Sequence, residues 1–384
     1  MRSRGFLRRR FGYGWGNWVM RCDWRECSLG ELITFQRGYD LPKNKMQGGI
    51  YPVIGSSGII GYHNEYTTEA PSITIGRSGN VGKPYLYKGK SWSHNTALYV
   101  KEYKNVNPLF IYYFLQTLNL GHYAGGTAVP TLNRNHIHSL SVVIPPLDVQ
   151  QKIASILSLL DDKIDLNRRI NANLEEQARA IWDSWFRSFE PFGGVMPDDW
   201  KYATLGDVTE NLRERARENN YPVFSVVCSG DLVLSDDFFH KRVYSKDISN
   251  YLVVNENNFA YSPPRINIGS IGINDFGYKG CVSPAYVVIK VPEGYEGYFY
   301  FYFKSRRFKA ESALRASGTV RQTLSYSDFA LIEMIYPSRE YAEKFNQIYK
   351  TVSNAKKTYE NETQKLVEIR DSLLPKLISG EIIP

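Results

Sequence analysis

The chain has little cysteine and no long apolar run. Only four cysteines lie among its 384 residues, at Cys22, Cys27, Cys228 and Cys281, and no two of them form a CxxC pair. This spacing argues against a disulfide framework and a zinc knuckle, and it is typical of a reducing compartment such as the cytoplasm. No apolar segment approaches the roughly 20 residues that cross a bilayer, so we expect no membrane span.

A phosphate-binding loop is also missing. The segment IGRSGNVGKP (75–84) resembles GxxxxGK followed by Ser or Thr, in which backbone amides, a lysine and a hydroxyl hold a nucleotide. Gly82 and Lys83 fit, but Arg77 stands at the first glycine position and Pro84 at the hydroxyl position. Proline offers neither a hydroxyl nor a backbone N–H. The segment therefore predicts a strand that ends in a tight, basic loop.

Motifs for catalysis on DNA are absent too. An adenine methyltransferase needs an Asn- or Asp-Pro-Pro-aromatic turn, whereas the nearest segment, 262–265, places arginine where a ring would stack on a flipped base. No glycine-rich loop opens a doubly wound cofactor domain. A nuclease needs clustered carboxylates with a lysine. The two aspartates at 198–199 have no further carboxylate or lysine nearby in the sequence that would convincingly complete such a site. His136 and His138 could hold a metal from one strand face, but a polar surface pair is the simpler interpretation. We predict a chain that is not an enzyme and binds no metal and no cofactor itself.

Positive charge is concentrated at the N-terminus. The net charge is +8, and residues 1–24 hold six arginines and one acid, which leaves +3 for the rest. Segment 1–22 is rich in arginine, yet it lacks the apolar core and cleavage site of a targeting peptide. We expect it to be a basic leader that is disordered or precedes the natural start, since Met20 opens a more ordinary sequence. Global basicity is therefore a weak argument for nucleic-acid binding.

The sequence contains two copies of one module. DWRECSLGEL (23–32) returns as DWKYATLGDV (199–208), and GTAVPTL (126–132) returns as GTVRQTL (318–324). In each copy an apolar stretch then runs into proline, and a long charged helical pattern follows. Such self-similarity indicates that one structural unit is used twice.

Each copy combines a β-rich domain with a long helix. Short β-branched and aromatic runs between Gly, Pro and Asn turns predict strands at 51–54, 73–75, 97–100 and 285–291. One helix per domain is expected near 108–117 and 298–307. The predicted fold class is α+β, with two β-rich domains in tandem repeat separated by two long helices. The boundaries are 23–147 for the first domain, 148–190 for the central helix, 191–337 for the second domain and 338–384 for the C-terminal helix.

Both long helices carry an apolar seam with 3-4 spacing, interrupted by polar residues. In the central helix the seam positions are Ile153, Leu157, Leu160, Ile164, Asn167, Asn171, Leu174, Ala178, Ile181 and Trp185. In the C-terminal helix they are Ile348, Val352, Ala355, Tyr359, Glu362, Leu366, Ile369 and Leu373. The pattern predicts an antiparallel coiled coil in which the two asparagines lie near Glu362 and set the register. The alternative is that each helix only docks on its own domain.

Such a coiled coil could separate two DNA-reading domains. Each helical pattern covers about 38 to 40 residues, or roughly 60 Å at 1.5 Å per residue. Duplex DNA repeats its groove every 34 to 36 Å, and proteins with two reading heads use that spacing. A rigid spacer would therefore combine two short contacts into one bipartite site.

Local charge favours DNA binding more in the first domain than in the second. Residues 25–147 hold eleven Lys and Arg against six acids, whereas 188–338 hold sixteen against eighteen, with cation clusters at 213–217 and 304–309. The recurring loops are better candidates, because their Arg and Asn side chains can read purines. The candidates are Arg77, Asn80, Lys83, Thr127, Asn133 and Arg134 in the first domain, and Arg265, Asn267, Thr319, Arg321 and Gln322 in the second. Since the two copies differ at these loops, the domains should read different sequences.

Several longer segments carry a family resemblance. They are WRECSLGEL with its repeat, the segment 145–186, YSPPRINIGSIG with VSPAYVV in the second copy, and the C-terminal IRDSLLPKLISGEI. By these segments, residues from about 20 to 384 resemble the specificity subunit of type I restriction-modification systems. The basic leader departs from the family pattern.

The resemblance implies two target-recognition domains that read the halves of an asymmetric bipartite DNA site, spaced by the coiled coil. It also implies that the chain has no catalysis of its own. The implied partners are double-stranded DNA, two methyltransferase subunits and, through them, restriction subunits that translocate and cut. S-adenosylmethionine, ATP and Mg²⁺ would then bind those partner subunits.

The sequence leaves two alternatives at the helices. Trp182, Trp185 and Phe186 cannot all face one partner helix, so they either cover the adjoining domain or bind another subunit. A structural dimeriser would share the heptads, but it would not need two divergent β-rich domains.

Overall fold

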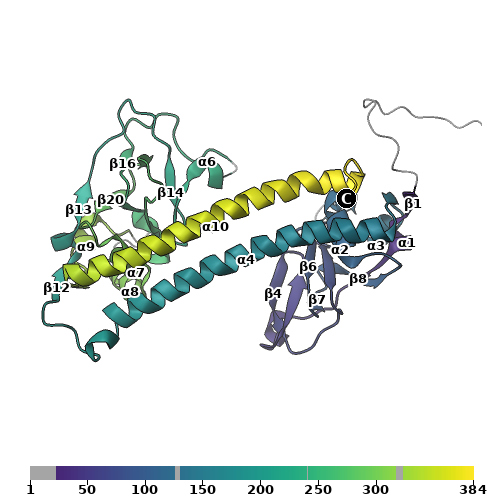
Figure 1. Ribbon diagram of the computed structural model, residues 1–384, viewed down its shortest axis with the longest axis horizontal. Coiled ribbons are helices and arrows are strands. Elements are labelled where there is room, and N and C mark those ends of the chain that lie inside the picture. The colour runs from purple at the N-terminus through teal and green to yellow at the C-terminus, as the bar shows by residue number, and fades with distance from the viewer. Residues whose placement is uncertain (1–22, 126–129, 240, 317–322) are drawn as a thin grey trace, which may run out of the picture. The chain divides into compact units, whose positions relative to one another are not determined.

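The computed structural model describes residues 23–125, 130–239, 241–316 and 323–384. It divides into two compact units, Met1–Asn167 with Asn361–Pro384, and Arg168–Glu360. Each unit contains one β-rich head and a segment of both long helices, α4 Leu147–Phe186 and α10 Arg339–Ser379 (teal and yellow in Figure 1). The predicted α+β class is confirmed. The boundary between the two units falls inside both long helices, at 167–168 in α4 and at 360–361 in α10. The predicted boundaries instead treated each helix as a separate segment.

The head of the first unit is built on an antiparallel sheet ordered β2-β8-β5-β6. Its strands are β2 Ile33–Arg37, β5 Ser72–Gly76, β6 Pro84–Tyr87 and β8 Ala97–Tyr103. A second sheet, ordered β4-β3-β7, contains β3 Tyr51–Gly55, β4 Gly58–His63 and β7 Trp92–Ser93. The other elements, with η for 3-10 helices, are β1 Arg25–Ser28, α1 Leu29–Leu32, η1 Lys43–Lys45, α2 Pro108–Thr117, η2 Leu120–Tyr123, β9 Ala124–Gly125, β10 Thr131–Leu132, α3 Arg134–His138 and β11 Ser141–Ile144.

The head of the second unit repeats this plan with a sheet ordered β13-β20-β17-β18. Its strands are β13 Glu210–Leu212, β17 Phe259–Tyr261, β18 Ile271–Ile273 and β20 Val287–Lys290. Paired strands are β12 Lys201–Thr204 with β21 Glu333–Tyr336, β14 Phe224–Val226 with β15 Leu232–Leu234, and β16 Leu252–Val254 with β19 Gly280–Val282. The helices are η3 Glu190–Phe192, α5 Leu205–Val208, α6 Ser235–Phe238, η4 Pro263–Ile268, α7 Glu296–Lys304, α8 Arg306–Arg315 and α9 Tyr326–Ala330. The helix predicted near 298–307 is therefore two helices, because Ser305 ends α7 and caps α8.

The sequence repeat is reproduced in the backbone. In each head the first strand pairs with the last, β1 with β11 and β12 with β21, and a one-turn helix follows the first strand. Both short helices carry a capping box, Ser28 with Glu31 in α1 and Thr204 with Asp207 in α5. We call these strands and capped helices the shared frame, because they place the variable loops in the same way in both heads.

Each head buries its apolar face against its own helix segments. In the first unit, Ile153 and Leu157 of α4 and Leu377 of α10 belong to the same core as the head. In the second unit, Trp182 and Phe186 of α4 lie in the core, and the Trp182 indole N–H donates to the Tyr298 carbonyl at 3.1 Å. The tryptophan-rich end of α4 therefore covers the adjoining head, which was one of the two predicted alternatives.

The long helices also pair antiparallel inside each unit. In the first unit Asp161 bonds Arg370, and Asn167 donates to Glu362 at 2.8 Å, as the seam predicted. In the second unit Asn171 donates to the Lys356 carbonyl at 3.1 Å, so its partner is not Glu362. The helices thus pair with each other and also dock on the heads, so the alternative that each helix only docks on its own domain was wrong.

The predicted seam is buried or half-buried at every position but one. Ile369 is 46% exposed, and the neighbouring Arg370 takes the inward position to reach Asp161. The seam assignment was therefore wrong at Ile369. Within the described ranges, no helix combines the length and apolar character that a membrane crossing needs.

Candidate nucleic-acid interface

The predicted basic loop follows β5 in the first unit and is as tight as expected. The amide of Gly76 donates to the Lys83 carbonyl at 3.0 Å, and the amide of Gly82 donates back to the Gly76 carbonyl at 2.8 Å. Gly79 and Gly82 have φ values of +84° and +77°, which favour glycine. The loop is therefore a closed backbone turn, in which Val81 packs against the core of the first unit.

The three candidates in this loop, Arg77, Asn80 and Lys83, differ in exposure. Asn80 and Lys83 are exposed and Arg77 is half-buried. Asn80 Nδ2 donates to Ser57 Oγ at 3.2 Å, which ties the loop to the β3–β4 turn. Burial lowers the pKa of Arg77, and the positive charge of Arg37 lowers it further.

Arg37 is a binding candidate that the sequence did not indicate. It ends β2, and β2 and β5 both pair with β8, where Arg37 and Ile75 both face Leu98. This register brings Arg37 to the sheet end where Arg77 begins its loop. Among the described residues neither guanidinium has a hydrogen-bond or ion-pair partner, so Arg77 is available to a base edge and Arg37 to a neighbouring DNA phosphate.

The second recurring loop joins the first. The Leu132 amide donates to the Arg77 carbonyl at 2.9 Å, and Thr131 forms a β-bridge with Ser78. Arg134 is exposed at the start of α3. The Asn133 side chain accepts from the Asn135 amide and caps α3.

The second unit brings its loops together in the same way. The Leu324 amide donates to the Pro263 carbonyl at 3.1 Å, matching the bond from Leu132 to Arg77. Arg265 is exposed and Asn267 half-buried, and both lie on η4, where we expected a loop. The remaining candidates, Thr127 in the first head and Thr319, Arg321 and Gln322 in the second, lie outside the described residues.

The cation clusters of the second head are partly engaged inside the protein. Lys304 contacts Glu175 and Asp231, and Arg215 donates to Asn250 at 2.8 Å. Arg265 has no such partner among the described residues. The exposed positive charge next to the paired loops of this head therefore includes Arg265 and Lys309, which lies beside Gly269.

The two histidines weighed as metal ligands have separate environments on α3. His136 is exposed, whereas His138 Nε2 accepts the Phe35 amide at 2.9 Å. Burial lowers the pKa of His138, and the nearby Arg134 and Lys104 lower it further, which keeps the ring neutral and able to accept. Within the described ranges, no three His, Cys, Asp or Glu side chains gather as metal ligands.

We expect His138→Ala to lower the free energy of unfolding by about 1–3 kcal/mol at pH 7.5, because the Phe35 amide loses its acceptor. The folded-state pKa of His138 lies below the unfolded value near 6.5. Its contribution is therefore complete above about pH 6.5 and is lost as the pH falls through the folded-state pKa. Urea denaturation should show a smaller difference between wild type and variant at pH 5.5 than at pH 7.5. An equal difference at both pH values, or the same trend in the control His136→Ala, would contradict this role.

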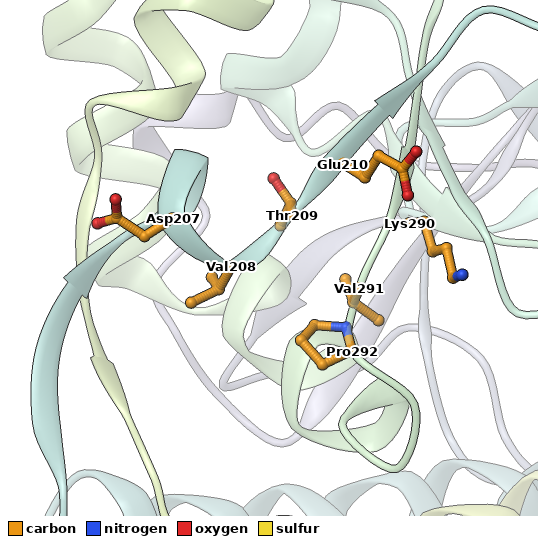
Figure 2. A pocket seen from close by; sticks show the side chains of 7 residues that line it. All are labelled: Asp207, Val208, Thr209, Glu210, Lys290, Val291 and Pro292. Atoms are coloured by element: carbon orange, nitrogen blue, oxygen red, sulfur yellow. The ribbon is translucent and has the colours of Figure 1, made fainter.

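A pocket in the second unit is not part of this interface. It has a volume of about 300 Å³ and is lined by Asp207, Val208, Thr209, Glu210, Lys290, Val291 and Pro292 (Figure 2). The Asp207 carboxylate accepts from the amide and hydroxyl of Thr204, and the Thr209 hydroxyl donates to the Leu205 carbonyl. The polar side chains of Asp207 and Thr209 therefore hold α5 and the residues next to it.

The fold is a tandem repeat of two β-rich heads with the same strand pairing and the same capped helix. A family model described as the type I restriction modification DNA specificity domain matches residues 22–176. Residues 22–176 therefore match a type I DNA specificity domain, and the chain is similar over most of its length to specificity subunits of type I restriction-modification systems.

Individual relatives agree with this family. The specificity subunit of the type I restriction enzyme MjaIX from Methanocaldococcus jannaschii is 26% identical over 298 residues, covering 71% of this chain and 68% of the relative. The HindI specificity subunit from Haemophilus influenzae is 26% identical over 329 residues, covering 66% and 71%. The crystal structure of a type I S subunit from M. genitalium has the same fold, with a TM-score of 0.66 at 16% identity over 96% of this chain and 98% of that chain.

Proposed function

We propose that the chain reads an asymmetric bipartite DNA site, with one head on each half-site. The observation that carries this proposal is the repeated loop pairing. In both heads an amide of the second loop bonds a carbonyl of the first, Leu132 to Arg77 and Leu324 to Pro263. One backbone arrangement thus presents two separate sets of side chains.

The two heads present different side chains from this common arrangement. The first offers Arg77 and Asn80 from a glycine turn, and the second offers Arg265 and Asn267 from η4. Arginine pairs with guanine and asparagine with adenine in the major groove. Because the loop pairing is shared but the first loop is a glycine turn in one head and η4 in the other, the two half-sites should differ in sequence.

The spacing between the half-sites is proposed to be set by α4 and α10. Each is one continuous helix, of 40 and 41 residues, and each supplies a segment to both units. A polar layer interrupts their apolar seam, where Glu362 accepts from Asn167 and pairs with Lys163 at 3.2 Å. Polar seam residues fix the register of a coiled coil, which a ruler requires.

DNA binding by this route should depend on salt. The chain alone is expected to bind random duplexes weakly. Its affinity should fall as salt rises, because Lys and Arg side chains release counterions from the DNA phosphates on binding, and this release is less favourable at high salt. Binding should become tighter and sequence-dependent when the methyltransferase subunits are added. A gel-shift series from 50 to 200 mM salt measures this. No binding at any salt, with or without those subunits, would favour a scaffold instead.

We further propose that the helices dock two methyltransferase subunits and, through them, restriction subunits. Leu159 and Leu166 of α4 support this, because they are 66% and 49% exposed and lie seven residues apart on one helix face in the first unit. Large apolar side chains on an outer helix face are typical of a subunit contact. S-adenosylmethionine, ATP and Mg²⁺ are assigned to those partners, and the proposed place of action is the cytoplasm.

The double variant Leu159→Glu with Leu166→Glu is expected to reduce copurification of the methyltransferase subunit about 10-fold or more, since buried leucines contribute roughly 1–2 kcal/mol each at an interface. Gln151→Glu, which adds charge at another exposed position of α4, is the control and should copurify normally. Equal copurification of wild type and double variant would place the docking surface elsewhere.

A further inference from the structure

A carboxylate joins three helices in the first unit. Asp161 of α4 accepts the Tyr113 hydroxyl of α2 at 2.6 Å and the Arg370 guanidinium of α10 at 2.8 Å. Tyr113 is fully buried, and the charged side chains of the pair are about a quarter exposed. Partly buried, charge-assisted bonds hold geometry better than exposed ion pairs do. We call this contact the first junction.

The first junction is connected to the basic loop through α2. After α2 the chain passes through Leu120 and Gly121, and a Cβ on Gly82 would lie 2.3 Å from the Gly121 nitrogen. Backbone therefore packs directly on backbone, so the loop and the end of α2 must move together. A cavity of about 510 Å³ is lined jointly by the loop, α2 and Arg370, which confirms that the three parts are neighbours.

The second unit has a junction with the same layout but different residues. Glu175 of α4 accepts Lys356 of α10 at 2.5 Å and Lys304 of α7 at 3.4 Å. Burial alone would raise the pKa of Glu175, but Lys304 and Lys356 outweigh it, so the pKa is lowered and the carboxylate stays charged. This contact is the second junction.

The second junction also reaches a reading element. Lys304 contacts Asp231 at 3.3 Å, beside Gly230. A Cβ on Gly230 would lie 3.2 Å from the Gly269 carbonyl, and Gly269 ends η4, which carries Arg265. In both units, then, the contacts run from the paired helices through one head helix and a glycine contact to the candidate reading residues.

We propose that Asp161 and Glu175 are positioning residues for DNA recognition. Each fixes the reading element of its own unit to the helix pair, so that the half-sites are accepted only at one spacing. This inference rests on the proposed bipartite reading. In this account the two junctions determine which spacer length is accepted, and the loops determine which bases are recognised.

The test uses Asp161→Asn and Glu175→Gln, which keep side-chain shape and remove charge. Each variant, assembled with the methyltransferase subunits, methylates a DNA library with randomised half-sites and spacer lengths. Both variants should keep the wild-type half-site sequences while methylation at spacers one base pair too long or too short rises at least threefold. Asp183→Asn, at another α4 carboxylate whose partner is the exposed Arg187, should match wild type.

The outcomes separate this inference from the proposed function. If the wild type shows no bipartite motif, the proposed function itself fails. If it shows one and both variants keep the wild-type spacer distribution, only the positioning role is overturned. A changed base preference with unchanged spacing would also overturn it, because the junctions would then act on reading rather than on position. Thermal melting of each variant confirms that the compared proteins are folded.

Discussion

A chain lengthened by four residues in both long helices is expected to methylate sites whose half-sites lie one to two base pairs further apart. The insertions belong after Asn171 in α4 and at Lys356 in α10, which are bonded to each other in the second unit. Four helical residues add roughly 6 Å at 1.5 Å each. One base pair occupies about 3.4 Å, since a turn of roughly 10 base pairs spans 34 to 36 Å. Methylation of a spacer-length library measures the shift.

The paired insertion has a matched control. Four residues inserted between Gly193 and Gly194, which face open space after η3, lengthen the chain without lengthening either helix. This control should keep the wild-type spacer preference. An unchanged preference in the paired-helix insertion would show that the helices do not set the distance.

Arg77→Ala is expected to relax base preference in one half-site by about 5- to 150-fold, while the other half-site is read as before. The reason is that one bidentate contact between arginine and guanine contributes roughly 1–3 kcal/mol of discrimination. Arg265→Ala should have the same effect on the opposite half-site. Methylation of a library randomised at both half-sites measures both variants in parallel.

Arg187→Ala is the control for these two variants. Arg187 directly follows α4 and is exposed, and among the described residues it pairs only with Asp183. This control should keep both half-site preferences. If Arg77→Ala weakened discrimination in both half-sites equally, the two heads would not read independently. If it lowered methylation of all sequences equally, Arg77 would be a phosphate contact.

The fold could be predicted from the sequence where the signal was repeated. The offset between the two copies placed β1 over β12 and α1 over α5, and the structure gives α1 and α5 the same capping box. Helix α2 begins and ends where it was predicted, because Asn107 caps it and proline follows. Repeats and capping residues can be recognised from the sequence alone, so the elements that they mark could be predicted without knowledge of the tertiary contacts.

The site was less predictable, because its residues meet through pairing between distant segments. Arg37 could not be found from a motif, since only the register of β2, β8 and β5 brings it beside Arg77. Asn133 was predicted to be a reader because of its loop position, and its role as the cap of α3 could not be read from that position. Ile369 fitted the heptad, yet Asp161 drew Arg370 inward in its place. In each case a long-range or competing contact outweighed the local pattern.

Methylation mapping of host DNA with and without this chain tests the central claim most directly. The claim is that two related heads read separate half-sites held at one distance. We predict one methylated motif with two unlike specific parts, separated by a gap of constant length and unspecified sequence. A single uninterrupted motif, or two specific parts at freely varying distances, would contradict it.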